Sequence, residues 1–162
     1  MSKATYHRLD IAARQLETAV ILFLSGRNLY SAITLAGAAS GILSQLVMNR
    51  GSETFVDYAR RVHNLLNGFT PPREKFNKRI NDSMGINALK HHAPTDPPSI
   101  DLDLEKAAEE AISKAMLDYI ELKGQQDPFI LAFLNRMWLT KDGPNLMTKF
   151  NATPNKIFRR TS

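Results

Sequence analysis

Hydrophobic positions in the first fifty residues recur with the period of two helices. The face of the first helix is formed by Leu9, Ala13, Leu16, Val20 and Phe23. The second helix is expected from about Leu29 to Met48, and its apolar stripe consists of Ile33, Ala36, Ser40, Leu43 and Val47. Gly26 lies in the short connection, where a glycine commonly terminates a helix. Two long helices with so short a connection predict an antiparallel hairpin.

Two further helices are expected in the middle of the chain. Ser52 is a suitable N-cap for the third, which ends at the helix-breaking sequence NGFTPPR. Its apolar residues are Phe55, Tyr58, Ala59, Val62, Leu65 and Leu66. The fourth begins near Pro72, and its apolar residues Phe76, Ile80 and Met84 are spaced by four. The proline-rich sequence APTDPPS then excludes regular structure.

The last part of the chain contains two more helical patterns. One extends from about Asp101 to Leu122, with acidic residues in its first turns. The other begins at Pro128, directly after Asp127 as an N-cap. No strand alternation and no internal repeat is visible. We therefore predict an all-α fold, a helical bundle of five to six helices built on a long antiparallel helix pair, forming one domain over residues 1–140 and followed by a basic C-terminal tail, residues 141–162.

Small residues cluster in the second helix, in the sequence LAGAASG, residues 35–41. Glycine inside a helix costs about 1 kcal/mol relative to alanine, so two glycines here need a structural reason. Close packing within the core is one explanation, because small side chains let helices approach each other. Close approach to a second copy across a dimer interface is the other.

The charge of the chain is unevenly distributed around its net value of +5. Residues 60–92 contain seven Lys or Arg and two acids, residues 93–127 three and nine, and residues 128–162 six and one. Basic segments attract nucleic acid through its phosphates. Alternatively, the basic and acidic segments face each other within or between subunits.

Several classes of protein are disfavoured by composition. The chain has no cysteine, which excludes disulfides, thiol chemistry and cysteine-based zinc sites. Its longest wholly apolar run, AVILFL, is far shorter than the ~20 residues of a membrane helix, and the charged N-terminus lacks a signal-peptide pattern. No phosphate-binding glycine loop or nucleophile elbow occurs. We expect a cytoplasmic protein with no membrane association, no cofactor and no metal.

Candidate chemistry is concentrated in the sequence MGINALKHHAP, residues 84–94. If the fourth helix continued, Asn87 and His91 would share one face, with Lys90 and His92 about 100° to either side. Imidazole is suited to general acid–base catalysis, lysine stabilises an anionic phosphate, and asparagine orients a ribose or phosphate. Three interpretations stay open: a polar helix end, a non-catalytic binding site, or the active site of a metal-independent ribonuclease.

The order of the helices and the sequence INALKH, residues 86–91, resemble the HEPN (higher eukaryote and prokaryote nucleotide-binding) superfamily. The resemblance extends over about residues 9–138 and includes SAITLAGAASGILSQLV, residues 31–47. It implies an all-α fold, a homodimer and, in many members, ribonuclease activity from an Arg-Asn/polar-x4–6-His motif composed at the dimer interface. Asn87 matches the polar position and His91 the histidine position.

One position departs from the family pattern. The arginine thought to hold the scissile phosphate is replaced by Ile86. Losing one preorganised donor of this kind typically costs ~10²–10³ in rate. Arg79 is a candidate binding residue, but on a continuous helix it would lie about 18 Å along the axis from His91. Lys90 is nearer but lacks the bidentate fork of arginine.

These observations lead to one leading function and two alternatives. We expect a HEPN-like domain that binds nucleic acid or a protein partner, with RNA or a nucleotide as possible ligands and without efficient catalysis. Asn87, Lys90, His92 and Arg79 are the candidate binding residues. The first alternative is a metal-independent endoribonuclease with His91 as its catalytic group. The second is the partner-masking subunit of a toxin–antitoxin-like pair.

Overall fold

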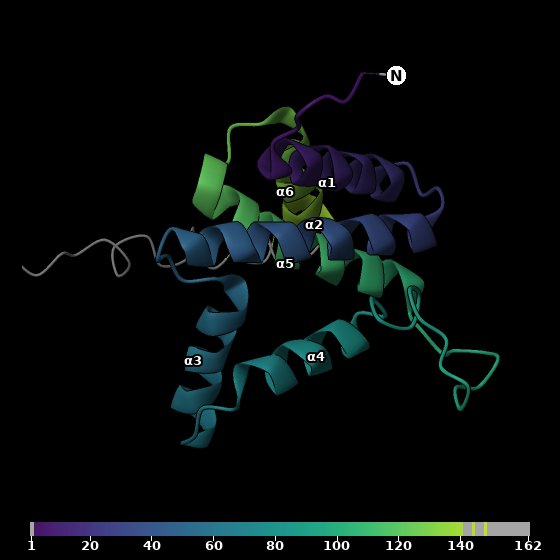
Figure 1. The fold of residues 1–162 in the computed structure, drawn as a ribbon, viewed down its shortest axis with the longest axis vertical. Coiled ribbons are helices and arrows are strands. Elements are labelled where there is room, and N and C mark those ends of the chain that lie inside the picture. Colours follow the sequence, from purple (N-terminus) through teal and green to yellow (C-terminus); the bar gives the residue numbers. More distant parts are fainter. Residues whose placement is uncertain (1, 141–143, 145–147, 149–162) are drawn as a thin grey trace, which may run out of the picture. The chain divides into compact units, whose positions relative to one another are not determined.

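The computed structural model describes residues 2–140, 144 and 148, and this part of the chain is all-helical (Figure 1). Its helices are α1 (Arg8–Leu24), α2 (Leu29–Asn49), α3 (Phe55–Asn67), α4 (Arg73–Ser83), α5 (Leu104–Lys123) and α6 (Pro128–Thr140). The predicted helical bundle is therefore confirmed. The chain divides into two compact units, residues 1–125 and residues 126–162, and each is described separately below.

The first unit is built on the predicted antiparallel pair of α1 and α2 (Figure 1). Helix α2 packs against both α1 and α5, so it lies at the centre of the apolar core. The buried side chains of these three helices are mostly small or aliphatic, and they include Leu16, Ile33, Leu43, Ala111 and Ile112. Alanine-rich faces allow close packing of helices.

The hairpin connection forms as the sequence indicated. Helix α1 ends in a Schellman motif, with Gly26 in the left-handed conformation (φ 65°) and the Arg27 N–H donating to the Leu22 carbonyl at 3.0 Å. Asn28, also left-handed (φ 44°), caps α2 by accepting a hydrogen bond from the Ser31 N–H at 3.2 Å. The two caps fix the reversal of the chain between α1 and α2.

By length and composition alone, α2 is the one described helix that could cross a membrane. Eight of its residues are buried against the bundle. The central helix of a water-soluble core passes the same test, so the expected cytoplasmic location and the absence of a membrane stay predictions.

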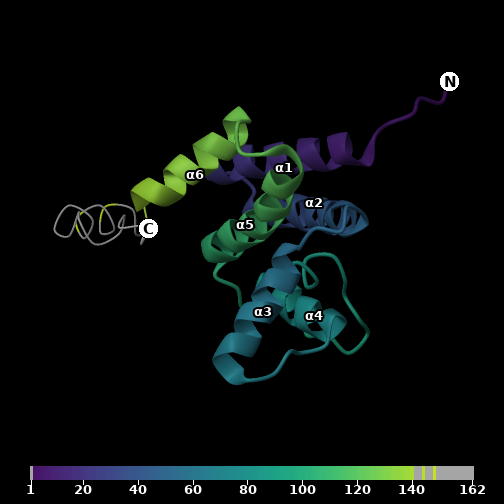
Figure 2. The same ribbon diagram turned by 90° about the vertical axis from the view of Figure 1, so that its left-hand side faces the viewer.

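Helices α3 and α4 lie on the opposite side of α2 from α1 (Figures 1 and 2). The expected N-cap Ser52 is wrong: Thr54 caps α3, because its hydroxyl oxygen accepts from the Asp57 N–H at 3.1 Å and its O–H donates to the Asp57 carboxylate at 2.9 Å. The only buried side chains of α3 and α4 are Val56 and Phe76, and Phe76 is still 8% exposed. Apolar burial therefore contributes little to the attachment of this pair.

The remaining helix starts lie at or near the expected positions. Helix α5 begins at Leu104 behind the N-cap Asp103, three residues after the expected start. In the second unit, α6 begins at Pro128, as predicted. The predicted single domain over residues 1–140 stays a prediction, and residues 141–162 lie outside the described part of the chain except at positions 144 and 148.

Candidate functional site

The polar motif lies in a turn that follows α4. Helix α4 ends at Ser83, and Gly85 takes the left-handed conformation (φ 70°), so the helix does not continue through the motif. A single helical turn follows, in which the His91 N–H donates to the Asn87 carbonyl at 3.0 Å. Asn87 and His91 are therefore still placed one turn apart.

The turn is anchored on α2 by Ile86. Ile86 is only 2% exposed, and its N–H donates to the Asn81 carbonyl at 3.0 Å. A Cβ added at Gly37 of α2 would lie 2.6 Å from Ile86 Cγ2, so the glycine leaves the space that Ile86 fills. Position 86, where the resemblance leads one to expect an arginine, is thus a core position in this chain. Of the two explanations for the small-residue cluster, close packing within the core applies to Gly37.

The second glycine of the cluster has a different environment. Gly41 is exposed, and a Cβ there would meet nothing within 4 Å. Internal packing therefore does not explain Gly41, and its role in a dimer stays a prediction.

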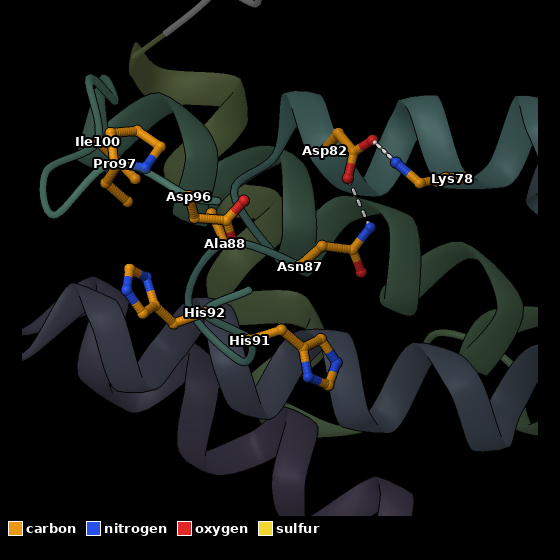
Figure 3. Close-up of a pocket in the computed structure, with 9 residues that line it drawn as sticks. All are labelled: Lys78, Asp82, Asn87, Ala88, His91, His92, Asp96, Pro97 and Ile100. Carbon is orange, nitrogen blue, oxygen red and sulfur yellow. Dashed lines mark hydrogen bonds and ion pairs between the residues drawn. The ribbon is translucent and has the colours of Figure 1, made fainter. Parts of the chain in front are cut away.

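A hollow of about 410 Å³ opens beside the motif turn (Figure 3). Its lining consists of Lys78, Asp82, Asn87, Ala88, His91, His92, Asp96, Pro97 and Ile100. Three of the predicted site residues, Asn87, His91 and His92, are therefore brought together. Lys78, Asp82 and Asp96 were not predicted, and nothing in their spacing identifies them without the turn at Gly85.

Both carboxylates of this hollow have internal partners. Asp82 accepts from Lys78 Nζ at 2.6 Å and from Asn87 Nδ2 at 2.6 Å (Figure 3). These two contacts, Lys78 first, hold the pKa of the Asp82 carboxyl below its usual value. Asp96 accepts from the Ala93 N–H at 2.6 Å. The side chain of Asn87 is therefore oriented by Asp82 and is not free to rotate toward a ligand without breaking that bond.

The two imidazoles are the accessible groups of the site. His91 and His92 are both exposed, and their rings point away from each other (Figure 3). Within the described residues neither ring has a hydrogen-bond partner. The pair can donate to or accept from a ligand on two sides of the turn, but it does not converge on one atom.

The other two predicted binding residues lie elsewhere. Lys90 does not line the hollow, and its Nζ lies near α2, 3.4 Å from where a Gly37 Cβ would be. Arg79 stacks over the ring of Phe76 at 5.2 Å and is likewise outside the hollow. Lys78, one residue earlier, lines the hollow instead.

A buried polar network was not predicted. Lys114 on α5 is 3% exposed, and its Nζ donates to Asn77 Oδ1 at 2.9 Å and Asn81 Oδ1 at 2.6 Å, both on α4. Asp118, one turn further along α5, is 1% exposed and accepts from the Phe55 N–H at 2.7 Å. Nothing in the sequence of α5 indicates this burial, because opposite charges four residues apart are an ordinary feature of solvent-exposed helix faces.

Burial shifts both ionisable groups of the network. Burial lowers the pKa of Lys114 to about 8, with Arg73 and Lys90 acting in the same direction and Asp118 against it. Burial also raises the pKa of the Asp118 carboxyl, against the Phe55 N–H, Lys114 and Arg73. Through Asn81, whose carbonyl accepts from Ile86, the network connects to the start of the motif turn.

Asp57 forms a second polar junction between α3 and α4. Its carboxylate accepts from Arg60 at 3.0 Å and from Arg73 at 3.2 Å. Arg60 also donates to the Pro71 carbonyl at 2.9 Å, which fixes the connection before α4. Among the residues described, no three His, Asp or Glu side chains gather in a way that could hold a metal ion.

No protein-family profile, curated protein or solved structure matches this chain. The resemblance to the HEPN superfamily therefore stays a prediction based on residues 31–47 and 86–91.

Proposed function

We propose that this chain is a HEPN-like domain that binds single-stranded RNA at the motif turn without cleaving it efficiently. The observation that supports this best is the burial of Ile86 against Gly37. The motif region keeps its accessible imidazoles but has a core side chain where the family has its phosphate-binding arginine. A site built in this way retains contacts for a ligand and lacks a donor for the transition state.

Single-stranded RNA suits the groups that are accessible. Exposed imidazole rings stack on unpaired bases, and they donate to phosphate when protonated. Lys78 lines the same hollow, and the exposed side chains of Lys75 and Arg79 lie on the same helix. A basic helix beside two exposed rings offers both the phosphate contacts and the stacking contacts that such binding uses.

The three cations nearest to His91 in the sequence are each in contact with other groups of the protein. Arg79 lies over Phe76, Lys90 is turned toward α2, and Lys78 is paired with Asp82. Catalysis by His91 would then need a cation from a second subunit. This alternative, a metal-independent endoribonuclease, predicts cleavage that depends on dimer formation.

One experiment separates the two functions. Purified protein is incubated in EDTA with a fluorescent mixed-sequence single-stranded RNA, and both anisotropy and cleavage are read at several salt concentrations. We expect salt-sensitive binding without cleavage. The His91→Ala/His92→Ala double variant should bind about tenfold or more weakly, since each stacked base is worth about 1–3 kcal/mol. His7→Ala is the matched control, because His7 is an exposed histidine before α1.

Each outcome has a definite meaning. Cleavage that disappears in the His91→Ala variant would establish the ribonuclease alternative. Binding that is unchanged in the double variant, or no binding at all, would contradict the proposed RNA site and leave the turn as a structural helix end.

A protein partner is the second candidate function, and exposed apolar residues favour it. Leu65, Leu66 and Phe69, at the end of α3, are 75%, 78% and 58% exposed. Neighbouring apolar side chains this exposed are typical of interaction sites. The partner would be a second copy, in the predicted homodimer, or another chain that this one masks. Light scattering of the purified protein and of a Leu65→Ser/Leu66→Ser variant tests the first, since a dimer through this end of α3 should dissociate in the variant.

A further inference from the structure

The hollow beside the motif turn carries a negative charge that RNA binding alone does not explain. Its ionised side chains are Lys78, Asp82 and Asp96. Lys78 is paired with Asp82 at 2.6 Å, so with the imidazoles counted as neutral the charge that remains in the lining is that of Asp96. A carboxylate repels a phosphate group, so the interior of the hollow does not suit the backbone of RNA. A carboxylate can, however, accept hydrogen bonds from the edge of a nucleobase.

Asp96 is held in a defined position in the loop that follows the motif turn. Its Oδ2 accepts from the Ala93 N–H at 2.6 Å, and its own N–H donates to the Ala93 carbonyl at 2.9 Å. Pro94, Pro97 and Pro98 restrict the backbone on either side. The side chain is exposed and lines the hollow, and among the described residues its Oδ1 has no hydrogen-bond donor. Because each carboxylate oxygen has two lone pairs, Asp96 offers a ligand in the hollow both of its oxygens.

The part of the hollow next to Asp96 has walls that suit a planar ring. Pro97 and Ile100 line it, and Ile100 is 48% exposed. The His92 ring lies on their side of the turn, whereas the His91 ring lies on the side of Asn87 (Figure 3). Unpaired RNA bases commonly stack on such rings, and a hollow of about 410 Å³ is within the range of small-molecule sites. A base that lies between His92 and this apolar wall would have its edge close to Asp96.

The cations that suit the phosphates of the same RNA lie beside the hollow and not in it. Lys75 and Arg79 are exposed on α4 and are not part of the lining. Lys75 is one turn from Lys78, which does line the hollow, so the two are separated by about 4.5 Å along the helix axis. A nucleotide whose base lies in the hollow can therefore place its neighbouring phosphates along α4.

We propose that this hollow binds a guanine base of the RNA, with the Asp96 carboxylate accepting hydrogen bonds from the guanine N1–H and N2 amino group. This inference rests on the proposed RNA binding at the motif turn. Guanine is the one RNA base whose Watson–Crick edge presents two adjacent donors, and a carboxylate accepts such a pair through both oxygens. Adenine and cytosine present one amino donor next to an acceptor, and uracil presents one N–H between two carbonyls. Each of these three edges therefore brings an acceptor against the carboxylate.

Five RNAs that differ in one base test this proposal with the full-length protein. They are fluorescent pentanucleotides of sequence UUNUU, where N is guanine, hypoxanthine, adenine, cytosine or uracil, and their affinities are measured by anisotropy in EDTA at one salt concentration. We expect the guanine RNA to bind about tenfold or more tightly than the adenine, cytosine and uracil RNAs, because a bidentate pair is lost in these. Hypoxanthine lacks only the N2 amino group, so its RNA should bind about three- to tenfold more weakly than the guanine RNA.

The variant Asp96→Asn identifies the residue responsible. It keeps an oxygen for the Ala93 N–H, and position 96 is exposed, so the loop should keep its conformation. Removing one negative charge favours all five RNAs alike, whereas losing the acceptor pair changes the ratio between them. We expect the preference for guanine over adenine to fall to about twofold or less.

The matched control is Asp101→Asn, which removes the same charge later in the same loop. Asp101 is exposed and lies outside the hollow, so this variant should keep the full preference for guanine. Loss of the preference in Asp101→Asn would show that it arises from the general charge of the loop and would overturn the role of Asp96.

The failure of this inference and the failure of RNA binding give different results. Equal affinity for the five RNAs, or a full guanine preference in Asp96→Asn, would overturn the guanine site and leave RNA binding at the motif turn in place. No binding of any of the five would contradict both. GMP carries the same base with a single phosphate and should bind about tenfold or more weakly than UUGUU. Equal affinity for GMP would overturn RNA as the source of the base and assign the hollow to a free guanine nucleotide.

Discussion

The first unit has two parts, the α1–α2–α5 layer and the α3–α4 pair, and different interactions stabilise each of them. Helices α1, α2 and α5 pack through aliphatic side chains such as Leu16, Ile33 and Ile112, all of which are 0% exposed. Helices α3 and α4 bury little apolar surface and are attached to α5 by hydrogen bonds that Lys114 donates to α4 and that Asp118 accepts from the start of α3. Apolar packing is non-directional, whereas buried polar contacts require particular partners and particular ionisation states.

This difference determines where function is placed. The motif turn directly follows α4, so the positions of His91 and His92 depend both on the polar contacts that attach α4 to α5 and on the packing of Ile86 against Gly37 of α2. The helices that form the apolar layer define the fold, and the polar attachment sets the position of the site. Local opening of α3 and α4 should therefore need less free energy than unfolding of the α1–α2–α5 layer.

The largest expected effect on stability comes from removing the ammonium group of Lys114, which attaches α4 to α5. Lys114→Met keeps the hydrocarbon volume but leaves Asn77 and Asn81 without their donor, and it removes one of the two cations, Lys114 and Arg73, that stabilise the Asp118 carboxylate. Breaking a buried charged network by removing one member typically costs about 3–5 kcal/mol in the free energy of unfolding. Urea denaturation measures it.

The matched control for this variant is Lys106→Met on the same helix. The Lys106 side chain is 66% exposed, and its Nζ lies 3.9 Å from the Glu110 carboxylate. We expect a change below about 0.5 kcal/mol. Equal effects of the two variants would show that the network contributes no more than a surface pair.

The next largest effect is a pH dependence of the free energy of unfolding, which arises from the buried Lys114. Burial lowers the pKa of Lys114 from 10.5 to about 8, so between these pH values the unfolded chain binds more protons than the folded one. The cost of burying the charged ammonium is thus fully present below pH about 8, and stability should rise by about 3 kcal/mol at most as the pH increases toward 10.5.

Other lysines and tyrosines titrate in the same range, so the comparison must be with a variant. We expect the free energy of unfolding of the unmodified protein, relative to that of Lys114→Met, to increase between pH 7.5 and pH 10.5 in urea titrations. Parallel pH profiles of the two proteins would mean that Lys114 is not buried in its charged form.

The sequence predicted the apolar half of the unit better than the polar half. Periodic apolar residues identified α1, α2 and α5, because a helix that buries one face has apolar residues every three or four positions in its sequence. Lys114 and Asp118 lie on α5 at the same spacing, but their burial depends on Asn77, Asn81 and the backbone of Phe55. Nothing local to α5 reveals those partners.

The candidate site was predicted in part for a similar reason. Asn87, His91 and His92 line one hollow, as their closeness in the sequence indicated. Lys90 and Arg79 lie outside it, because the Lys90 ammonium lies near α2 and the Arg79 guanidinium lies over Phe76. The turn at Gly85, which a continued fourth helix would not have, was not predicted. The contact between Ile86 and Gly37 joins positions 49 residues apart, which no local pattern can predict.

The contact between Gly37 of α2 and Ile86 of the motif turn can be tested by adding one methyl group at Gly37. In Gly37→Ala the new Cβ would lie 2.6 Å from Ile86 Cγ2, which is attached close to the backbone and cannot simply rotate away. Overpacking of this kind typically costs about 1–3 kcal/mol. We expect reduced stability together with amide chemical-shift changes over residues 84–92, measured by NMR.

A double-mutant cycle makes this prediction specific. Ile86→Ala removes the clashing methyl group, so the cost of Gly37→Ala should be smaller in that background by about 1 kcal/mol or more. Strictly additive effects would show that Ile86 does not contact Gly37.

The smallest expected effect has the opposite sign and concerns the other glycine of the same helix. Gly41 lies in the middle of α2, and a Cβ there would meet nothing within 4 Å. Alanine is favoured over glycine in a helix by about 0.5–1 kcal/mol, because glycine loses more backbone freedom on folding. Gly41→Ala should therefore raise the free energy of unfolding by about that amount, in contrast to Gly37→Ala. A loss of stability that grows with protein concentration would instead show that Gly41 faces a second copy of the chain, because only an interface between copies could then make the added methyl group unfavourable.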